Sequence, residues 1–490
     1  MLYNENNFYK HTKGSKVFMT DFLFDMILSE LEDAVGRENC STKTIDKITH
    51  GVDYFWLSRM WADRGLRMPE ADVVVSPENA KEVSNVLKIA NYYKIPVTTW
   101  GGGGGTQGGA LPVCGGIVLD TKRMNKIYDI NEKSMYIECG TGAVYKHIEW
   151  AANERGYATM HYPSSLTCST VGGFLAHRGI GVVSTKYGKI DDMVLQMEVV
   201  LPNGEIINTS SAPKHAAGPD LNQIFIGSEG TLGIMTKAQM RIYDQPETRR
   251  FRGFLFHNMT DAFNAGRELL QKFKPSVMRL YDEAETSTLI KKIVGVSKPG
   301  AFMNVAVEGV SEIVDAEEKI MLNLFAKYNA EDLGSEYGEK WWKEKITFFY
   351  PDNMMDLPQM FGTMDTIAPY DKIENIYWEM KKAIETNFPM AKFIAHFSHW
   401  YEWGCMIYDR FIVDDVPKDP HEALRLHNEI WNCGVRCAIA NGGVVNDHHG
   451  VGIKLGRLMK EQYGPAMQVF EGIKKQLDPN GILNPFKLGL

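Results

Sequence analysis

Seven glycines lie between Gly101 and Gly109, interrupted only by Thr106 and Gln107. Glycine adopts positive φ at little steric cost, so the backbone N–H groups of such a loop can point together at one anion. The length of the run suits a diphosphate, and we expect positive φ at Gly104 and Gly105. A flexible glycine turn between two strands is the alternative interpretation.

Two further tracts of small residues follow in the same half of the chain, at residues 163–173 and 227–233. Both are rich in hydroxyl residues and glycine, which lets a ligand lie close to the backbone. The glycine run contains the GxGxxG spacing, but no amphipathic helix begins at its end and no acidic residue follows at the distance that a Rossmann fold requires. We therefore expect three loops to contact a cofactor without a Rossmann motif.

Four side chains are candidates for proton transfer: His161, Tyr408, His448 and His449. Histidine titrates closest to neutral pH and is the obvious general base. Taken alone, His161 is typical of a hydrogen-bonded loop histidine, and Tyr408 is typical of an aromatic residue in a buried strand. The adjacent imidazoles of His448 and His449 stand beside Gly450-Val451-Gly452, where a plain turn would rarely use them, and they favour a pocket.

The apolar pattern of the first half predicts the elements that position these loops. Ser76-Pro77 is typical of a helix start, and we expect that helix to run toward Tyr93 and to precede a strand at residues 95–100. Further strands are expected at residues 117–120, 135–139 and 193–201, and a further helix at residues 144–156. This order is not a regular βαβ alternation, so the predicted fold class is α+β.

The second half has longer amphipathic helices, expected at residues 261–273 and 311–328, and strand-like runs at residues 251–256 and 302–307. We place a domain boundary near residue 247. The first predicted domain is residues 1–247, completed by about 455–490, and the second is residues 248–454. A last helix begins at Pro465, and its predicted apolar face consists of Met467, Phe470, Ile473 and Leu477.

Composition and charge exclude several classes of protein. The chain has 490 residues, 44% of them apolar and 23% charged, which is typical of a globular protein with two or three domains. The net charge of −8 comes without a long basic run, which argues against nucleic-acid binding. No apolar run approaches the roughly 20 residues of a membrane span, and no signal peptide is recognisable, so we expect a cytoplasmic protein. The cysteines form no CxxC pair, so we expect reduced thiols.

The three tracts, with Lys186-Tyr187-Gly188 and Asp191-Asp192 between them, resemble the FAD-binding half of the vanillyl-alcohol oxidase and p-cresol methylhydroxylase superfamily. The second half resembles alkyldihydroxyacetonephosphate synthase and the D-2-hydroxyacid (lactate, glycolate) dehydrogenases. The segments that carry this resemblance are residues 279–282, 398–408, 447–452 and 477–482. The resemblance implies a two-domain flavoprotein, with an N-terminal FAD-binding domain and a C-terminal substrate (cap) domain whose antiparallel sheet is flanked by helices.

The resemblance also implies roles for individual residues. The catalytic set is His161, Tyr408, His448 and His449, and the substrate-binding set is Arg279, Asp352, His396 and His399. The glycine run becomes the pyrophosphate loop, residues 164–173 the tract along the flavin, and residues 227–233 the wall near the adenine and ribose. The implied cofactor-binding residues are Trp100, Gly101, Gly102, Gly103, Gly104, Gly105, Thr106, Gln107, Gly108, Pro163, Ser164, Ser165, Thr170, Gly172, Gly173, Tyr187, Gly188, Glu229, Gly230, Gly233 and Ile234. No histidine lies in the glycine loop, so we expect noncovalent FAD.

Two positions depart from the synthase pattern. Where that family carries an arginine after an aromatic-rich run, this chain has residues 349–353 with Asp352, and Asp447 replaces the first histidine of a triple. Arginine is the usual clamp for an acidic group, so its loss argues against a phosphorylated or carboxylated substrate. His396, His399, His448 and His449 lie roughly where the dehydrogenases ligate a metal, but the matching carboxylate and spacing are missing, and we expect no metal.

The resulting prediction is an FAD-dependent oxidoreductase, either a dehydrogenase or an oxidase, that transfers a hydride from an alcohol or 2-hydroxy-acid carbon to flavin N5. One alternative keeps FAD but forms an ether bond without net redox change. Another is a degenerate flavin-binding scaffold. The expected partners are a small-molecule substrate and an electron acceptor, with oxygen, a quinone and an electron-transfer flavoprotein all open, and we expect a homodimer.

Overall fold

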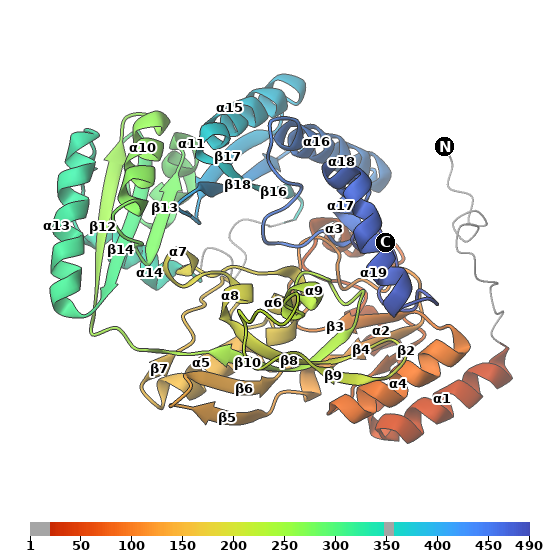
Figure 1. Ribbon diagram of the computed structural model, residues 1–490. Helices are drawn as coiled ribbons and strands as arrows, with labels where there is room; N and C mark the ends of the chain where they lie inside the picture. Colours follow the sequence, from red (N-terminus) through yellow and green to blue (C-terminus); the bar gives the residue numbers. More distant parts are fainter. Residues whose placement is uncertain (1–19, 347–356) are drawn as a thin grey trace.

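The computed structural model describes residues 20–346 and 357–490. Figure 1 shows an N-terminal lobe built on two sheets and a second lobe built on one larger sheet, with the C-terminal helices beside both. No helix of these described residues combines the length and apolarity that a membrane span requires. The predicted α+β class with two domains is confirmed.

The first sheet of the N-terminal lobe places the glycine run at a strand end. Its order is β1-β2-β4-β3, with β2, β4 and β3 parallel. Their bounds are Cys40–Ser41 (β1), Val73–Val75 (β2), Val97–Trp100 (β3) and Ile117–Asp120 (β4). Because β3 ends at Trp100, the chain leaves the sheet directly into the glycines.

Helix α4 (Ala80–Tyr93) packs Val83, Val86 and Leu87 against this sheet. The Asn79 side chain accepts the backbone N–H of Glu82, so Asn79 is the N-cap and the helix begins at Ala80. The predicted start at Ser76-Pro77 is therefore wrong, because Asn79 satisfies the first helical N–H groups and Pro77 does not enter the helix.

The second sheet of this lobe supports the other two loop tracts. Its order is β5-β6-β10-β8-β9, entirely antiparallel. The strands are Ile127–Asn131 (β5), Tyr136–Gly140 (β6), Val194–Val200 (β8), Ile206–Asn208 (β9) and Ile234–Arg241 (β10). A two-stranded ribbon pairs Tyr157–Ala158 (β7) with Tyr243–Asp244 (β11). The other helices of this lobe are Asp21–Val35 (α1), Thr44–Thr49 (α2), Trp56–Asp63 (α3), Tyr145–Asn153 (α5), Val171–His177 (α6), Ser184–Tyr187 (α7), Ile190–Met193 (α8) and Asn222–Phe225 (α9).

The second lobe contains a seven-stranded antiparallel sheet of order β15-β12-β14-β13-β17-β18-β16. The strands are Thr248–Phe256 (β12), Val277–Tyr281 (β13), Ala301–Gly309 (β14), Glu331–Asp332 (β15), Met360–Pro369 (β16), Lys392–Phe397 (β17) and Gly404–Val413 (β18). Helices cover its outer side in Figure 1, among them Met259–Leu270 (α10), Ser311–Lys327 (α13), Tyr370–Asn387 (α15) and Pro420–Ala440 (α16). Shorter helices are Glu283–Glu285 (α11), Lys291–Ile293 (α12) and Glu336–Glu344 (α14).

The C-terminal segment contacts both lobes. It contains Gly452–Leu455 (α17), Met459–Tyr463 (α18) and Met467–Leu477 (α19). Leu455, Leu458 and Met459 belong to the apolar core that includes the large sheet, whereas Ile482 and Leu483 pack with the first sheet of the N-terminal lobe. The domain bounds proposed above stay a prediction.

The predicted apolar face of the last helix is only partly buried. Met467 is buried, but Phe470 remains 37% exposed and contacts Tyr463. The predicted helix is α19, and its apolar face is buried at Met467 but partly exposed at Phe470.

Candidate active site

A cavity between the two lobes is lined by all three predicted loop tracts. From the predicted cofactor set it includes Gly101, Gly102, Gly103, Gly104, Gly105, Thr106, Gln107, Pro163, Ser164, Ser165, Thr170, Gly172, Gly173, Glu229, Gly230, Gly233 and Ile234. The second lobe adds Arg279, His399, Tyr408, His448 and His449. Residues far apart in the sequence thus form one continuous wall.

Close approach between loops explains why the run needs glycine. A Cβ atom on Gly102 would lie 2.1 Å from the carbonyl oxygen of Cys168, and Gly103 has φ of +64°. Positive φ occurs at Gly103 and Gly108, not at Gly104 and Gly105, so that expectation is wrong. A Cβ atom on Gly105 would meet no atom within 4 Å, so this position faces open space in the cavity wall.

The chemistry of the wall fits a dinucleotide. Thr99 Oγ1, Thr106 Oγ1 and both amide atoms of Gln107 are buried without a hydrogen-bond partner among the described residues. Buried polar atoms are costly unless they are paired, so these atoms indicate a polar ligand at the glycine run. These residues and the glycine backbone would hold the pyrophosphate, while residues 164–173 and 230–234 provide the walls beside it.

A buried carboxylate connects the histidine loop to the cofactor lobe. Glu229 accepts the backbone N–H groups of Val451 and Gly452. Burial raises the pKa of Glu229 to about 7, although these two N–H groups lower it. A Cβ atom on Gly452 would lie 2.1 Å from the carbonyl oxygen of Gln107, so the two loops are in close contact.

Tyr408, which lines the cavity, belongs to a row of paired residues across four strands of the second lobe. Tyr281 pairs with His396, His396 with Tyr408, and Tyr408 with Asp365, on β13, β17, β18 and β16. Directly paired residues on neighbouring strands share one face of a sheet. This register brings residues nearly 130 positions apart in the sequence to the same face of the sheet, with Tyr408 at the cavity and the other three behind it.

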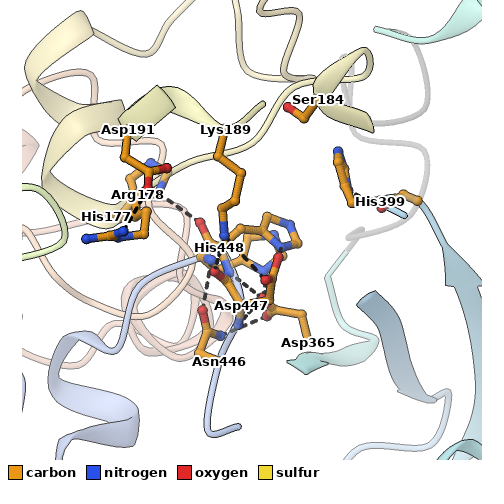
Figure 2. A network of polar contacts seen from close by, with 12 residues as sticks. His177, Arg178, Ser184, Lys189, Asp191, Asp365, His399, Asn446, Asp447 and His448 are labelled. Atoms are coloured by element: carbon orange, nitrogen blue, oxygen red, sulfur yellow. Dashed lines mark hydrogen bonds and ion pairs between the residues drawn. The ribbon is translucent and has the colours of Figure 1, made fainter. Parts of the chain in front are cut away.

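Asp365 holds both adjacent histidines. Its Oδ1 lies 2.7 Å from His449 Nδ1, and its Oδ2 lies 3.1 Å from His448 Nδ1. It also accepts the backbone N–H groups of Asp447 and His448 and the side-chain amide of Asn446. Figure 2 shows this network, with Asp365 and Asn446 below His448. Burial opposes ionisation of Asp365, but the two imidazoles hold its pKa well below the usual range.

Asp447 points away from the cavity. Its carboxylate lies 3.3 Å from Lys189 Nζ and 3.2 Å from His448 Nδ1, and Lys189 also donates to the Asp447 carbonyl at 2.8 Å (Figure 2). Burial opposes ionisation, but Lys189 and His448 lower the pKa of Asp447 to about 2. The charge that replaces the family's histidine is therefore compensated.

A cation lines the cavity, contrary to the argument from the missing arginine. Arg279 donates to His396 Nε2 at 2.9 Å, and its buried Nε has no hydrogen-bond partner among residues 20–346 and 357–490. The nearby carboxylate of Glu285 instead forms an ion pair with Arg410 and accepts a hydrogen bond from His396 Nδ1. Burial opposes ionisation, but Arg410 and His396 lower the pKa of Glu285 to about 2, so it is ionised. Arg279 is left with no carboxylate partner in the described part of the chain.

Several predicted site residues lie behind the wall and do not line it. His161 is fully buried between the rings of Tyr145 and Phe174, and burial lowers its pKa to about 3. His396 stacks on Tyr408 and contacts Arg279. Trp100, Gly108, Tyr187 and Gly188 also lie outside the lining. Asp352 falls outside the described residues.

Other residues of the site were not predicted from the sequence. His177 lines the cavity and donates from Nδ1 to the carbonyl of His448 at 2.9 Å. Asp365 and Lys189, which contact the histidine loop, were also missed. His448, His449 and Asp365 each offer one possible metal-ligand atom, and these atoms lie within 4.8 Å of one another. The contacts of both imidazoles with the Asp365 carboxylate explain that closeness. The absence of a metal stays a prediction.

Comparisons with known proteins agree with this geometry. Residues 71–210 match the FAD binding domain family, and residues 245–488 match the C-terminal domain of FAD linked oxidases. The uncharacterized FAD-linked oxidoreductase YgcU of Escherichia coli K12 is 31% identical over 94% of this chain and 97% of its own.

The chain belongs to the family of FAD-linked oxidoreductases. A D-lactate dehydrogenase of Archaeoglobus fulgidus is 30% identical over 86% of this chain and 92% of its own. A structure of alkyldihydroxyacetonephosphate synthase superposes with a TM-score of 0.80 at 24% identity, over 94% of this chain and 86% of that one. The predicted resemblance is confirmed, and FAD is the cofactor of this protein.

Proposed function

We propose that this protein is a dehydrogenase or oxidase of 2-hydroxy acids, which removes a hydride from the carbon that bears the hydroxyl group. The observation that carries the proposal is Arg279, a guanidinium in the cavity wall whose buried Nε–H has no hydrogen-bond partner among the described residues. A guanidinium binds a carboxylate through two parallel hydrogen bonds, and a 2-hydroxy acid offers such a carboxylate next to its hydroxyl-bearing carbon. This choice narrows the sequence-based prediction of an alcohol or 2-hydroxy acid, and it reverses the sequence argument against a carboxylated substrate.

The charges around Arg279 favour an anionic substrate. Glu285 neutralises Arg410, and His396 is held neutral because burial lowers its pKa to about 3 against the effect of Glu285. Arg279 therefore contributes a positive charge to the cavity that a substrate carboxylate would balance. A buried charge without a partner is costly, so the site gains by binding an anion.

The remaining wall residues supply the proton chemistry. Tyr408, His448 and His449 line the same cavity as Arg279. A substrate held by its carboxylate at Arg279 would place its hydroxyl group toward the tandem histidines, where one imidazole takes the hydroxyl proton as the carbonyl forms. When bound, FAD supplies the hydride acceptor at N5.

Ether formation without net redox change is the second candidate. It is favoured by the likeness of the fold to alkyldihydroxyacetonephosphate synthase and by the tandem histidines. A phosphate ester carries about two negative charges, so Arg279 alone would balance it only in part. We therefore rank this activity second.

A cytoplasmic location and a homodimer remain part of the proposal.

The experiment is anaerobic mixing of the holoprotein with a panel of compounds while flavin absorbance near 450 nm is followed. The panel pairs each 2-hydroxy acid, in both enantiomers, with the diol in which the carboxylate is reduced to an alcohol. We expect one enantiomer of a hydroxy acid to bleach the flavin and its diol to do so far more slowly. Equal rates with acid and diol would contradict the role of Arg279. Exchange of a fatty alcohol into an acyl ester of dihydroxyacetone phosphate would support the second candidate instead.

A further inference from the structure

Both histidines of the tandem pair contact one carboxylate through the same ring atom. Asp365 faces Nδ1 of His448 and Nδ1 of His449, and among the described residues neither Nε2 has a hydrogen-bond partner. Asp365 is 1% exposed, and its remaining contacts are N–H donors from residues 446–448. An ionised carboxylate can only accept, so it selects the histidine form that carries a proton on Nδ1.

The two imidazoles differ in a second respect. His448 Nδ1 lies between two carboxylates, 3.1 Å from Asp365 and 3.2 Å from Asp447, whereas His449 Nδ1 contacts Asp365 alone. The ring centroids are 3.9 Å apart, so two cations would repel each other strongly.

We propose that Asp365 is a positioning residue that fixes both imidazoles with Nδ1 protonated and, together with Asp447, makes His448 the cation and His449 the neutral base. Both rings then present Nε2 to the cavity, His448 as a proton donor and His449 as a proton acceptor. This inference rests on the proposed function only in naming what His449 deprotonates, which is the substrate hydroxyl group.

The other groups around the pair are consistent with this assignment. They are Tyr408 from β18, His399 after β17, His177 from α6, and Lys189 before α8. Burial lowers the pKa of His448, but Asp365 and Asp447 more than offset it and the net pKa is raised. Burial lowers the pKa of His449 and outweighs the effect of Asp365. Opposite shifts in two neighbouring groups are typical of an acid and base pair.

The test is ¹⁵N NMR of the holoprotein labelled at histidine, because it needs no substrate and fails independently of the proposed function. His448→Gln and His449→Gln spectra assign the two rings. We expect His449 to carry its proton on Nδ1 at neutral pH, and His448 to be doubly protonated and to lose its proton at higher pH than His449. A proton on Nε2 of neutral His449 would overturn the proposal.

Two matched variants separate the carboxylates. In Asp365→Asn, the proton affinity of His448 should fall at least tenfold and the Nδ1 preference of His449 should be lost. In Asp447→Asn, the proton affinity of His448 should fall while His449 keeps its Nδ1 proton. Flavin absorbance confirms that each variant holds FAD. If Asp365→Asn does not fold, the wild-type spectrum and Asp447→Asn still decide. Titrations of both rings that do not change in Asp365→Asn would refute the proposal.

Discussion

Two alanine substitutions in the glycine run should separate the folding of the loop from the binding of FAD. Gly102→Ala places a methyl group 2.1 Å from the carbonyl oxygen of Cys168, which is far inside an ordinary contact. Gly105→Ala places the same methyl group in open space of the cavity wall. Neither residue has positive φ, so backbone strain does not separate the two variants. They differ only in the atoms that the new methyl group contacts.

The magnitudes follow from these contacts. In Gly102→Ala the two loops must separate by roughly 1 Å, and overpacking of this kind costs about 1–3 kcal/mol. The apoprotein should lose that amount of unfolding free energy. Gly105→Ala should leave apoprotein stability unchanged or raise it by about 0.4–1 kcal/mol, because alanine restricts the unfolded chain. FAD affinity should fall roughly tenfold or more in both, since the methyl group on Gly105 occupies the space of the diphosphate.

The assay is denaturant unfolding of each apoprotein, followed by FAD titration monitored through flavin fluorescence. Gly472→Ala is the control, because its Cβ also meets no atom within 4 Å but lies on α19, outside the cavity lining. It should match the wild type in FAD affinity. Wild-type FAD affinity in Gly105→Ala would show that the diphosphate does not bind at this loop and would refute the argument.

Three further predictions concern charges in and around the cavity. In steady-state assays, Arg279→Gln should lower kcat/KM for a 2-hydroxy acid roughly 10- to 150-fold, which corresponds to the loss of one charge-assisted hydrogen bond. The same substitution should leave kcat/KM for a neutral alcohol unchanged. Lys189→Met should lower the free energy of unfolding by about 3–5 kcal/mol, because it breaks a buried ion pair and leaves Asp447 to share His448 with Asp365, and adding Asp447→Asn should recover most of that loss. The pKa of Glu285 is about 2 in the folded protein and 4.5 in the unfolded chain. Ionised Glu285 therefore contributes about 3 kcal/mol to the free energy of unfolding, and this contribution is complete above pH 4.5 and is lost as the pH falls toward 2. The stability difference between the wild type and Glu285→Gln should therefore shrink as pH falls through that window, and a constant difference would contradict the ion pair with Arg410.

The sequence predicted those elements whose apolar pattern is bounded by clear turn signals. The strand at residues 117–120 and the helix at residues 311–328 agree with β4 and α13 to within one residue. Strands β16 and β17 were missed because their residues are buried on both faces and therefore show no regular alternation of apolar and polar side chains. The buried strand expected around Tyr408 is β18, although its bounds were not predicted. The spacing within α19 predicted an apolar face, but spacing alone does not say what covers it.

The site could be predicted where its residues are neighbours in the sequence. The glycine run and the His448-His449 pair were found for that reason. Arg279 was identified by family resemblance. Its positive charge was not taken into account, because the search for a cation was limited to residues 349–353, where the family has an arginine. Asp365 had a usable signal, because it is the single charged residue of its strand. Its partners lie about 80 residues away, in the segment that follows α16, and only the packing of that segment against β16 brings them together.

The most direct test of the central claim is anaerobic stopped-flow reduction of the flavin by a 2-hydroxy acid carrying either hydrogen or deuterium on its C2 carbon. If the cavity removes a hydride from the hydroxyl-bearing carbon, the deuterated acid should bleach the flavin measurably more slowly, and the flavin should stay bleached until an electron acceptor is added. The absence of bleaching by any 2-hydroxy acid, together with efficient alkyl exchange in which the flavin ends each turnover oxidised, would contradict the account.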